Sequence, residues 1–204
     1  DLQAKSGIFT ATCVEEPRDE KEAERILAAA KNDEWNVVSV DETEQARSPR
    51  APFTTSTLQQ TASTRLGFSP SRTMRTAQKL YEAGFITYMR TDSPNISKDA
   101  QTQILSVVVK EFGAGYAQER VYKTKSKSAQ EAHEAIRPTH MGSEHAGSTP
   151  EQQALYALIW QRTIASQMAD AKILRSKIEV AVESDTSIPH FSANGSRTLS
   201  HGWL

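Results

Sequence analysis

The stretch GFITYMRTDS, residues 84–93, holds the one arrangement of side chains in this 204-residue sequence that looks built for chemistry. Its centre, FITYM, is β-branched and aromatic and lies between a glycine and the turn residues Asp-Ser-Pro, which predicts a short strand between two turns. Alternate residues of a strand face the same side, so we expect Tyr88 and Arg90 to project together with Ile86, while the intervening residues face the other way. The pattern therefore predicts a phenol and a guanidinium side by side.

These two side chains suit one kind of reaction. A free tyrosine has a pKa of about 10, so it is a poor nucleophile at neutral pH unless a cation stabilises the phenolate or a base removes the proton. Arg90 is permanently charged, and its planar fork matches two phosphate oxygens, so it can stabilise charge that builds on a phosphodiester under attack. The alternative that spacing alone leaves open is an exposed tyrosine beside a solvated arginine.

The longer string ITYMRTDS, residues 86–93, resembles the active-site segment of type IA DNA topoisomerases. The resemblance implies that Tyr88 attacks one DNA strand and carries its 5′ phosphate covalently, while Arg90 contacts the scissile phosphate. With Met89 at this position, the segment resembles the bacterial topoisomerase I branch more than the topoisomerase III branch, which more often has proline there. The implied activity cleaves and rejoins one strand to relax negative supercoils, and the implied partner is single-stranded DNA.

A second segment, QEAHEAIRPT at residues 130–139, resembles the His-Glu-Ala-Ile-Arg-Pro motif of the same family, which implies that His133 lies near the DNA backbone. On a helical turn His133 and Arg137 would share a face, and the following proline would stop the helix. A zinc-protease interpretation needs a second histidine where Arg137 stands, and His140 and His145 have no carboxylate or cysteine partners at ligand spacing. We therefore expect no metal site in this chain, and expect Mg²⁺ only for the full-length enzyme that the resemblance implies.

Charge is unevenly placed along a chain whose formal net charge is −1. Acidic residues outnumber basic ones from Glu15 to Glu44, so this stretch is not expected to touch DNA. Basic residues outnumber acidic ones from Arg65 to Lys98, around the tyrosine, and this local excess suits phosphate contacts. Beyond Tyr88 and Arg90, the expected DNA-contacting residues are Arg65, Arg72, Thr91, His133 and Arg137.

Two helices are expected before the tyrosine. Thr55 or Ser56 can cap the first, which ends at Gly67, and Ser69-Pro70 can start the second, which runs to residue 83. Together with the strand after them, the two helices resemble a winged helix-turn-helix.

The second of these helices carries a basic face. A spacing of three and four residues places Arg72, Arg75 and Lys79 on its outer side. That side is either an ordinary solvated face or a DNA-binding one. The string APFTTSTLQQ, residues 51–60, also resembles the start of the tyrosine-bearing domain in bacterial topoisomerase I, which favours a surface for one strand.

The sequence predicts an α+β fold with strands at both ends. The expected remaining elements are strands over 7–14 and 35–40, helices capped by Asp19, Ser97 and Thr149, and a strand from Ser176 with a hairpin turn at Asn194-Gly195. The simplest assembly pairs the terminal strands into a small β-rich domain, residues 1–47 and 172–204, and inserts a mostly helical, tyrosine-bearing domain at 48–171. This is similar to the family's β-rich arch, which carries a helical domain with the helix-turn-helix-like element.

Composition sets aside some classes of protein. Cys13 is the one cysteine, which excludes an internal disulfide and a cysteine-based zinc cluster and fits a reducing cytoplasm. No apolar run approaches a membrane span. The family's acidic Asp-x-Asp-x-Glu cluster has no counterpart here, so we expect a topoisomerase fragment that is inactive alone and works with missing domains of the same polypeptide. The alternative is a non-catalytic winged-helix DNA-binding module in which Tyr88 is structural.

Overall fold

The computed structural model describes residues 1–4, 7–32, 34–122, 134–183 and 185–204. The chain forms two compact units, one made of Asp1–Arg47 with Lys172–Ser200 and the other of Ser48–Ala171 with His201–Leu204. The architecture mixes helices and strands, which confirms the predicted α+β class.

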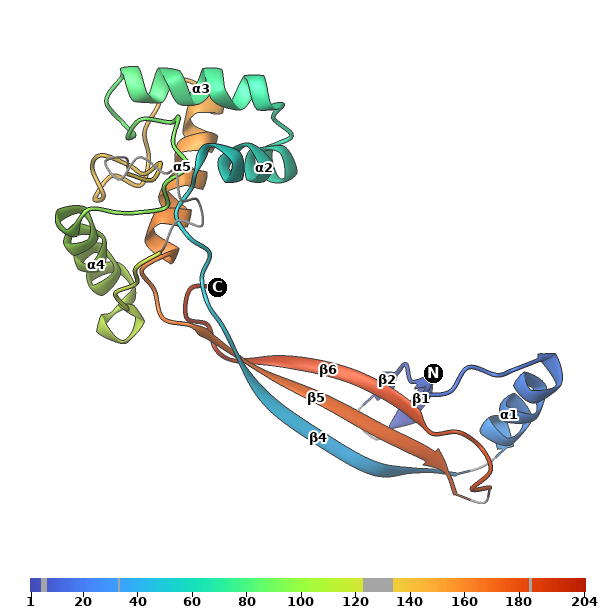
Figure 1. The fold of residues 1–204 in the computed structure, drawn as a ribbon. Coiled ribbons are helices and arrows are strands. Elements are labelled where there is room, and N and C mark those ends of the chain that lie inside the picture. The colour runs from blue at the N-terminus through green and yellow to red at the C-terminus, as the bar shows by residue number, and fades with distance from the viewer. Residues whose placement is uncertain (5–6, 33, 123–133, 184) are drawn as a thin grey trace. The chain divides into compact units, whose positions relative to one another are not determined.

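The first unit is mostly β. Its two-stranded antiparallel sheet joins β1 (Leu2–Ala4) to β2 (Gly7–Phe9). Its four-stranded sheet has the order β3-β6-β5-β4, and Figure 1 shows the last three as a long twisted ribbon. These strands are β3 (Thr12–Cys13), β4 (Trp35–Arg47), β5 (Ala171–Val182) and β6 (Phe191–Ser200).

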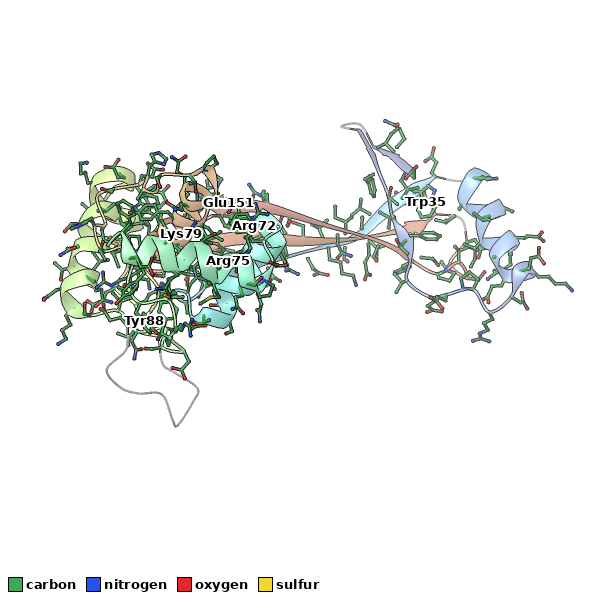
Figure 2. All side chains as sticks on the ribbon, turned by 90° about the horizontal axis from the view of Figure 1, so that it is seen from above. Trp35, Arg72, Arg75, Lys79, Tyr88 and Glu151 are labelled. Carbon is green, nitrogen blue, oxygen red and sulfur yellow. The ribbon has the colours of Figure 1, made fainter. Side chains whose placement is uncertain are left out.

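One helix supplies this unit with a small core. Helix α1 (Glu20–Asn32) begins after Asp19, whose carboxylate accepts the N–H of Glu22 at 2.8 Å, as the capping signal predicts. The ring of Trp35, labelled in Figure 2, meets the ring of Phe191 edge to face at 5.1 Å between centroids. The buried residues of this core are Ile26, Val182 and Ile188.

The predicted hairpin turn at Asn194-Gly195 is wrong. Both residues lie inside β6, where Asn194 pairs with Lys177 and Gly195 with Ser176. The register pairs Phe191 with Val180 near the apolar end of the sheet, and this pairing with β5 outweighs the turn preference of Asn194-Gly195.

The second unit is mostly helical. Its helices are α2 (Thr55–Leu66), α3 (Pro70–Glu82), α4 (Lys98–Phe112), the short 3₁₀ helix η1 (Ala114–Tyr116) and α5 (Pro150–Ala165). Hydroxyls of Ser69 and Thr149 cap α3 and α5, as expected, whereas Thr54 caps α2 in place of the expected Thr55 or Ser56. Gly67 ends α2 with a φ of +67°, which glycine adopts without strain.

The core of this unit lies between α2, α3, α4 and α5 (Figure 1). Its fully buried side chains include Phe53, Leu58, Leu80, Ile104 and Tyr156. Trp203 packs against the same cluster, so residues 201–204 belong to the helical unit and not, as we predicted, to the β-rich one. Among the described residues, none of the helices has the length and apolarity that a membrane span requires.

Candidate active site

The tyrosine segment is extended but does not form the predicted strand. After α3, Gly84 turns the chain with a φ of +75°. Across residues 85–89, all of them described, only Ile86 forms a β-bridge, and its partner is Pro138. The ladder does not extend, because the N–H of Phe85 donates to the carbonyl of Leu80 and the N–H of Arg137 donates to the hydroxyl of Thr87, not to backbone carbonyls across the bridge. Because residues 85–89 form no strand, the predicted winged helix-turn-helix lacks its wing at this place. Its two helices, α2 and α3, do pack on each other.

Tyr88 and Arg90 nevertheless face outward together. Tyr88 is 43% exposed and Arg90 is also exposed, while Met89 between them is 1% exposed and Thr91 after them 7%. This is the alternation of an extended chain with one side in the core. Ile86 was predicted on the same side as Tyr88 and Arg90 and is instead buried, because the alternation does not continue through the irregular residues 85–87.

Thr55, at the start of α2, holds this segment in place. Its hydroxyl donates to the carbonyl of Met89 at 2.8 Å and accepts the N–H of Thr91 at 2.9 Å. Its own N–H donates to the carbonyl of Thr91 at 2.9 Å. The backbone on both sides of Arg90 is therefore fixed to a helix terminus, which limits where Tyr88 and Arg90 can point.

The ring of Tyr88 rests on one further aromatic side chain. Tyr81, in the last turn of α3, meets it edge to face with 5.3 Å between ring centroids. Such pairs contribute about 0.5 to 1.5 kcal/mol beyond buried area. Within the described part of the chain, the Tyr88 hydroxyl and the Arg90 guanidinium have no hydrogen bond or ion pair, and both side chains are exposed.

The segment of residues 134–139 is extended and not the helical turn that we predicted. Ile136 donates its N–H to the carbonyl of Phe53 at 2.8 Å, and Thr87 donates its N–H to the carbonyl of Arg137 at 2.9 Å. The hydroxyl of Thr87 also donates to the carbonyl of Ala135 at 2.7 Å. The segment thus lies between the start of α2 and the tyrosine segment. His133, the predicted backbone-contacting residue, lies outside the described residues.

Arg137 is turned inward and paired. Its guanidinium donates to Glu134 at 2.5 Å and to the carbonyl of Pro138 at 2.9 Å. Burial disfavours the charged form of Glu134, but hydrogen bonds from the Ser97 N–H and from Arg137 outweigh it, so the pKa of Glu134 lies below its ordinary value. Arg137 therefore has a structural role: through Glu134 it connects the start of α4 to the tyrosine segment.

The chain is similar to known proteins over nearly its whole length. The family model described as DNA topoisomerase matches residues 2–204. The chain belongs to the DNA topoisomerase family. DNA topoisomerase 1 of Streptomyces coelicolor is 46% identical over 192 residues, which cover 91% of this chain and 20% of that protein.

Two other relatives agree with this membership. The prokaryotic-type DNA topoisomerase 1 of Acanthamoeba polyphaga mimivirus is 51% identical over 147 residues, or 71% of this chain and 17% of the relative. The full-length topoisomerase I structure from Thermotoga maritima is 31% identical with a TM-score of 0.76, and the match covers 98% of this chain and 32% of that one. The predicted membership in the bacterial topoisomerase I branch of type IA is confirmed. The topoisomerase chain spans about a fifth of the length of the curated relatives that it matches.

The other predicted DNA contacts of this topoisomerase chain lie in differing surroundings. Arg65 is exposed in the last turn of α2. Arg72 on α3 pairs with Glu151 and stacks on Phe68, and Figure 2 shows Arg75 and Lys79 farther along the same helix. Thr91 is buried and its hydroxyl accepts the N–H of Ser93 at 3.1 Å, so it supports the segment from inside. A direct contact between Thr91 and DNA stays a prediction that its burial does not favour.

The described residues do not fit the Mg²⁺ that we expect for the full-length topoisomerase. No group of three or more His, Cys, Asp or Glu side chains within this part of the chain could hold a metal ion.

Sequence reasoning missed several residues of this topoisomerase site. Thr55 was treated as a helix cap, and Glu134 as part of a motif without a role. Their partners, Met89 and Ser97, stand 34 and 37 residues away, so no local pattern reveals the pairings. The sequence indicated the role of Tyr81 only weakly: it follows the buried Leu80 near the end of α3, so its ring lies at the edge of the buried face of the helix.

Proposed function

We propose that this chain supplies the nucleophile of a DNA topoisomerase that cleaves and rejoins one strand. The observation that carries the proposal is that Tyr88 and Arg90 both project outward from a backbone that Thr55 and Met89 hold in the core. Membership in the DNA topoisomerase family supports the same proposal. A non-catalytic winged-helix module is not favoured, because residues 85–89 form no wing strand.

The reaction requires three functions, of which the chain has two. The Tyr88 oxygen attacks the phosphorus, the bond to the 3′ oxygen breaks, and the 5′ phosphate remains on the tyrosine. Arg90 stabilises the charge that develops on the phosphate oxygens. A donor must protonate the leaving 3′ oxygen, and the free 3′ hydroxyl later attacks the phosphotyrosine to restore the strand and the phenol. We assign the donor to parts of the full-length protein outside this chain.

The chain alone is accordingly expected not to relax supercoiled DNA. Rejoining after passage of the other strand would relax negative supercoils in the complete enzyme. The substrate is single-stranded DNA, since an attack by Tyr88 on one phosphodiester needs one strand accessible.

A chimera tests this function. The chain replaces the matching segment of the Streptomyces coelicolor topoisomerase, and the chimera is mixed with a single-stranded oligonucleotide labelled at its 3′ end. We expect the label to become covalently attached to protein, and to stay free with Tyr88→Phe. Attachment of a 5′-end label instead, or an adduct with Tyr88→Phe, would overturn the assignment.

A further inference from the structure

Arg162, on α5, lies in an unusual position for an arginine. Its guanidinium carbon stands 4.2 Å above the centre of the Phe53 ring, and it donates a hydrogen bond to the carbonyl of Ala51 at 3.3 Å. Phe53 is fully buried, so one face of the guanidinium is shielded from water. An arginine held in this way is normally balanced by a carboxylate.

Two other arginines act electrostatically on Arg162. Arg50 precedes the carbonyl that Arg162 binds, and Arg65 lies in the last turn of α2, which is a neighbour of α5. Burial, reinforced by repulsion from Arg50 and Arg65, lowers the pKa of Arg162 to about 10. Among the described residues Arg162 has no ion pair, and the cluster therefore carries uncompensated positive charge.

The loop that carries Arg50 is fixed on both sides. Pro49 is buried, and the carbonyl of Ala51 accepts from Arg162. The hydroxyl of Tyr122 lies 3.5 Å from the carbonyl of Pro49 and donates to the carbonyl of Ser166 at 2.9 Å, so Tyr122 connects this loop to the end of α5. Arg162 is held by its own contacts and Arg50 is carried on a fixed backbone, so with Arg65 they offer several charged donors to a tetrahedral anion.

We propose that Arg50, Arg65 and Arg162 bind a backbone phosphate of the DNA strand at a position other than the one that Tyr88 attacks. The inference rests on the proposed function for the identity of the anion. Phe53 and Thr55 lie two residues apart, at most about 7 Å of extended chain. Phe53 supports Arg162, while Thr55 holds the backbone next to Tyr88, so one short segment links the two sites.

Binding of a short fluorescent oligothymidine to the whole chain, measured over a range of salt concentrations, tests the proposal. We expect Arg50→Gln and Arg65→Gln each to weaken binding several-fold and to reduce the slope of log K against log salt by about 0.7, the value for one lost single-strand phosphate contact. The matched control is Arg18→Gln, which removes the same charge from the exposed acidic stretch of the first unit and should leave the slope unchanged.

Thermal stability supplies a second measurement. If the three arginines only stabilised the fold, removing one of them would not raise the Tm. Removing an exposed like charge relieves repulsion, so Arg50→Gln should raise the Tm at low salt by on the order of 1 °C while it weakens DNA binding. Arg162→Gln serves as a third variant, with its Tm checked because it also loses the contact with Phe53. Wild-type slopes in all three variants, or a lower Tm for Arg50→Gln with unchanged DNA binding, would overturn the inference.

Two further arms separate the possible causes. Inorganic phosphate that raises the Tm of the wild type, with no change of slope in the variants, would assign the cluster to free phosphate and overturn the DNA assignment. The covalent-adduct test with the chimera is independent: an adduct with unchanged slopes removes only this inference, whereas changed slopes without an adduct remove only the proposed function.

Discussion

Thr55 and Thr91 are joined by two reciprocal hydrogen bonds, each 2.9 Å long: the Thr55 N–H donates to the carbonyl of Thr91, and the Thr91 N–H donates to the hydroxyl of Thr55. The residues stand 36 positions apart in the sequence. This pair fixes the backbone immediately after Arg90, so the orientation of the candidate catalytic side chains depends on a helix terminus far from them in the chain.

Thr55→Val should reduce both stability and cleavage. Valine keeps the shape of threonine but leaves the Thr91 N–H without its acceptor, which typically costs about 1 to 3 kcal/mol. We expect that loss in urea unfolding of the chain and a lower rate of adduct formation in the chimera. Thr64→Val, on the same helix but exposed, is the control and should change either quantity little. If both variants lose equal stability, the Thr55–Thr91 pair has no special role.

Glu134→Gln should destabilise the chain in a pH-dependent way. The folded-state pKa of Glu134 lies below its ordinary value of 4.5, because hydrogen bonds from Ser97 and Arg137 outweigh the cost of burial. The ionised group therefore contributes stability above the unfolded pKa, and this contribution is lost as pH falls through the folded pKa. We expect a deficit of about 1 to 3 kcal/mol at pH 7, which shrinks as pH falls below 4.5 and closes as pH falls through the lowered folded-state pKa.

Urea unfolding from pH 7 to pH 3 measures this deficit. Glu111→Gln is the matched control, because its exposed pairing with Lys110 contributes little. A deficit for Glu134→Gln that stays constant with pH would show that packing, and not charge, connects Glu134 to Arg137.

Glu151→Gln should strengthen DNA binding. Glu151 pairs with Arg72, and Arg75 and Lys79 also lie close enough to help lower its pKa (Figure 2). Neutralising Glu151 frees Arg72 and removes a negative charge from the basic face of α3, so more phosphate contact becomes available. We expect tighter oligonucleotide binding with a steeper salt dependence, and a stability close to that of wild type because the pair is exposed. Unchanged affinity would show that this face of α3 does not meet DNA.

The sequence was most informative where structure is set locally. Ser69 before Pro70, and Thr149 before Pro150, start their helices as predicted, because a cap and an N1 proline act within one turn. Residues 85–89 have strand-forming side chains, yet they form no ladder, since the Phe85 N–H donates to Leu80 and the Arg137 N–H, 50 residues from Thr87, donates to the Thr87 hydroxyl. Arg162 was assigned only to a helix. Its neighbours Arg50 and Arg65 become apparent once α2 and α5 are packed together.

Arg90→Lys should slow cleavage far more than it weakens binding. Arg90 is exposed beside Tyr88 on a fixed backbone, and we assign it to hold a phosphate in one orientation. A planar fork can do this with two donors, whereas a lysine ammonium meets the phosphate as a point charge. Loss of one preorganised contact of this kind costs about 3 to 4 kcal/mol of transition-state stabilisation, roughly a hundred- to a thousandfold in rate.

Single-turnover adduct formation and oligonucleotide affinity, measured in the chimera at one salt concentration, separate the two effects. Ground-state affinity should fall only a few-fold, because lysine retains the charge. Arg197→Lys, an exposed position on β6, is the control for the exchange itself and should match wild type in both measurements. Equal losses of rate and affinity in Arg90→Lys would mean that Arg90 merely helps to hold the strand, and the stabilising role would then have to pass to another residue.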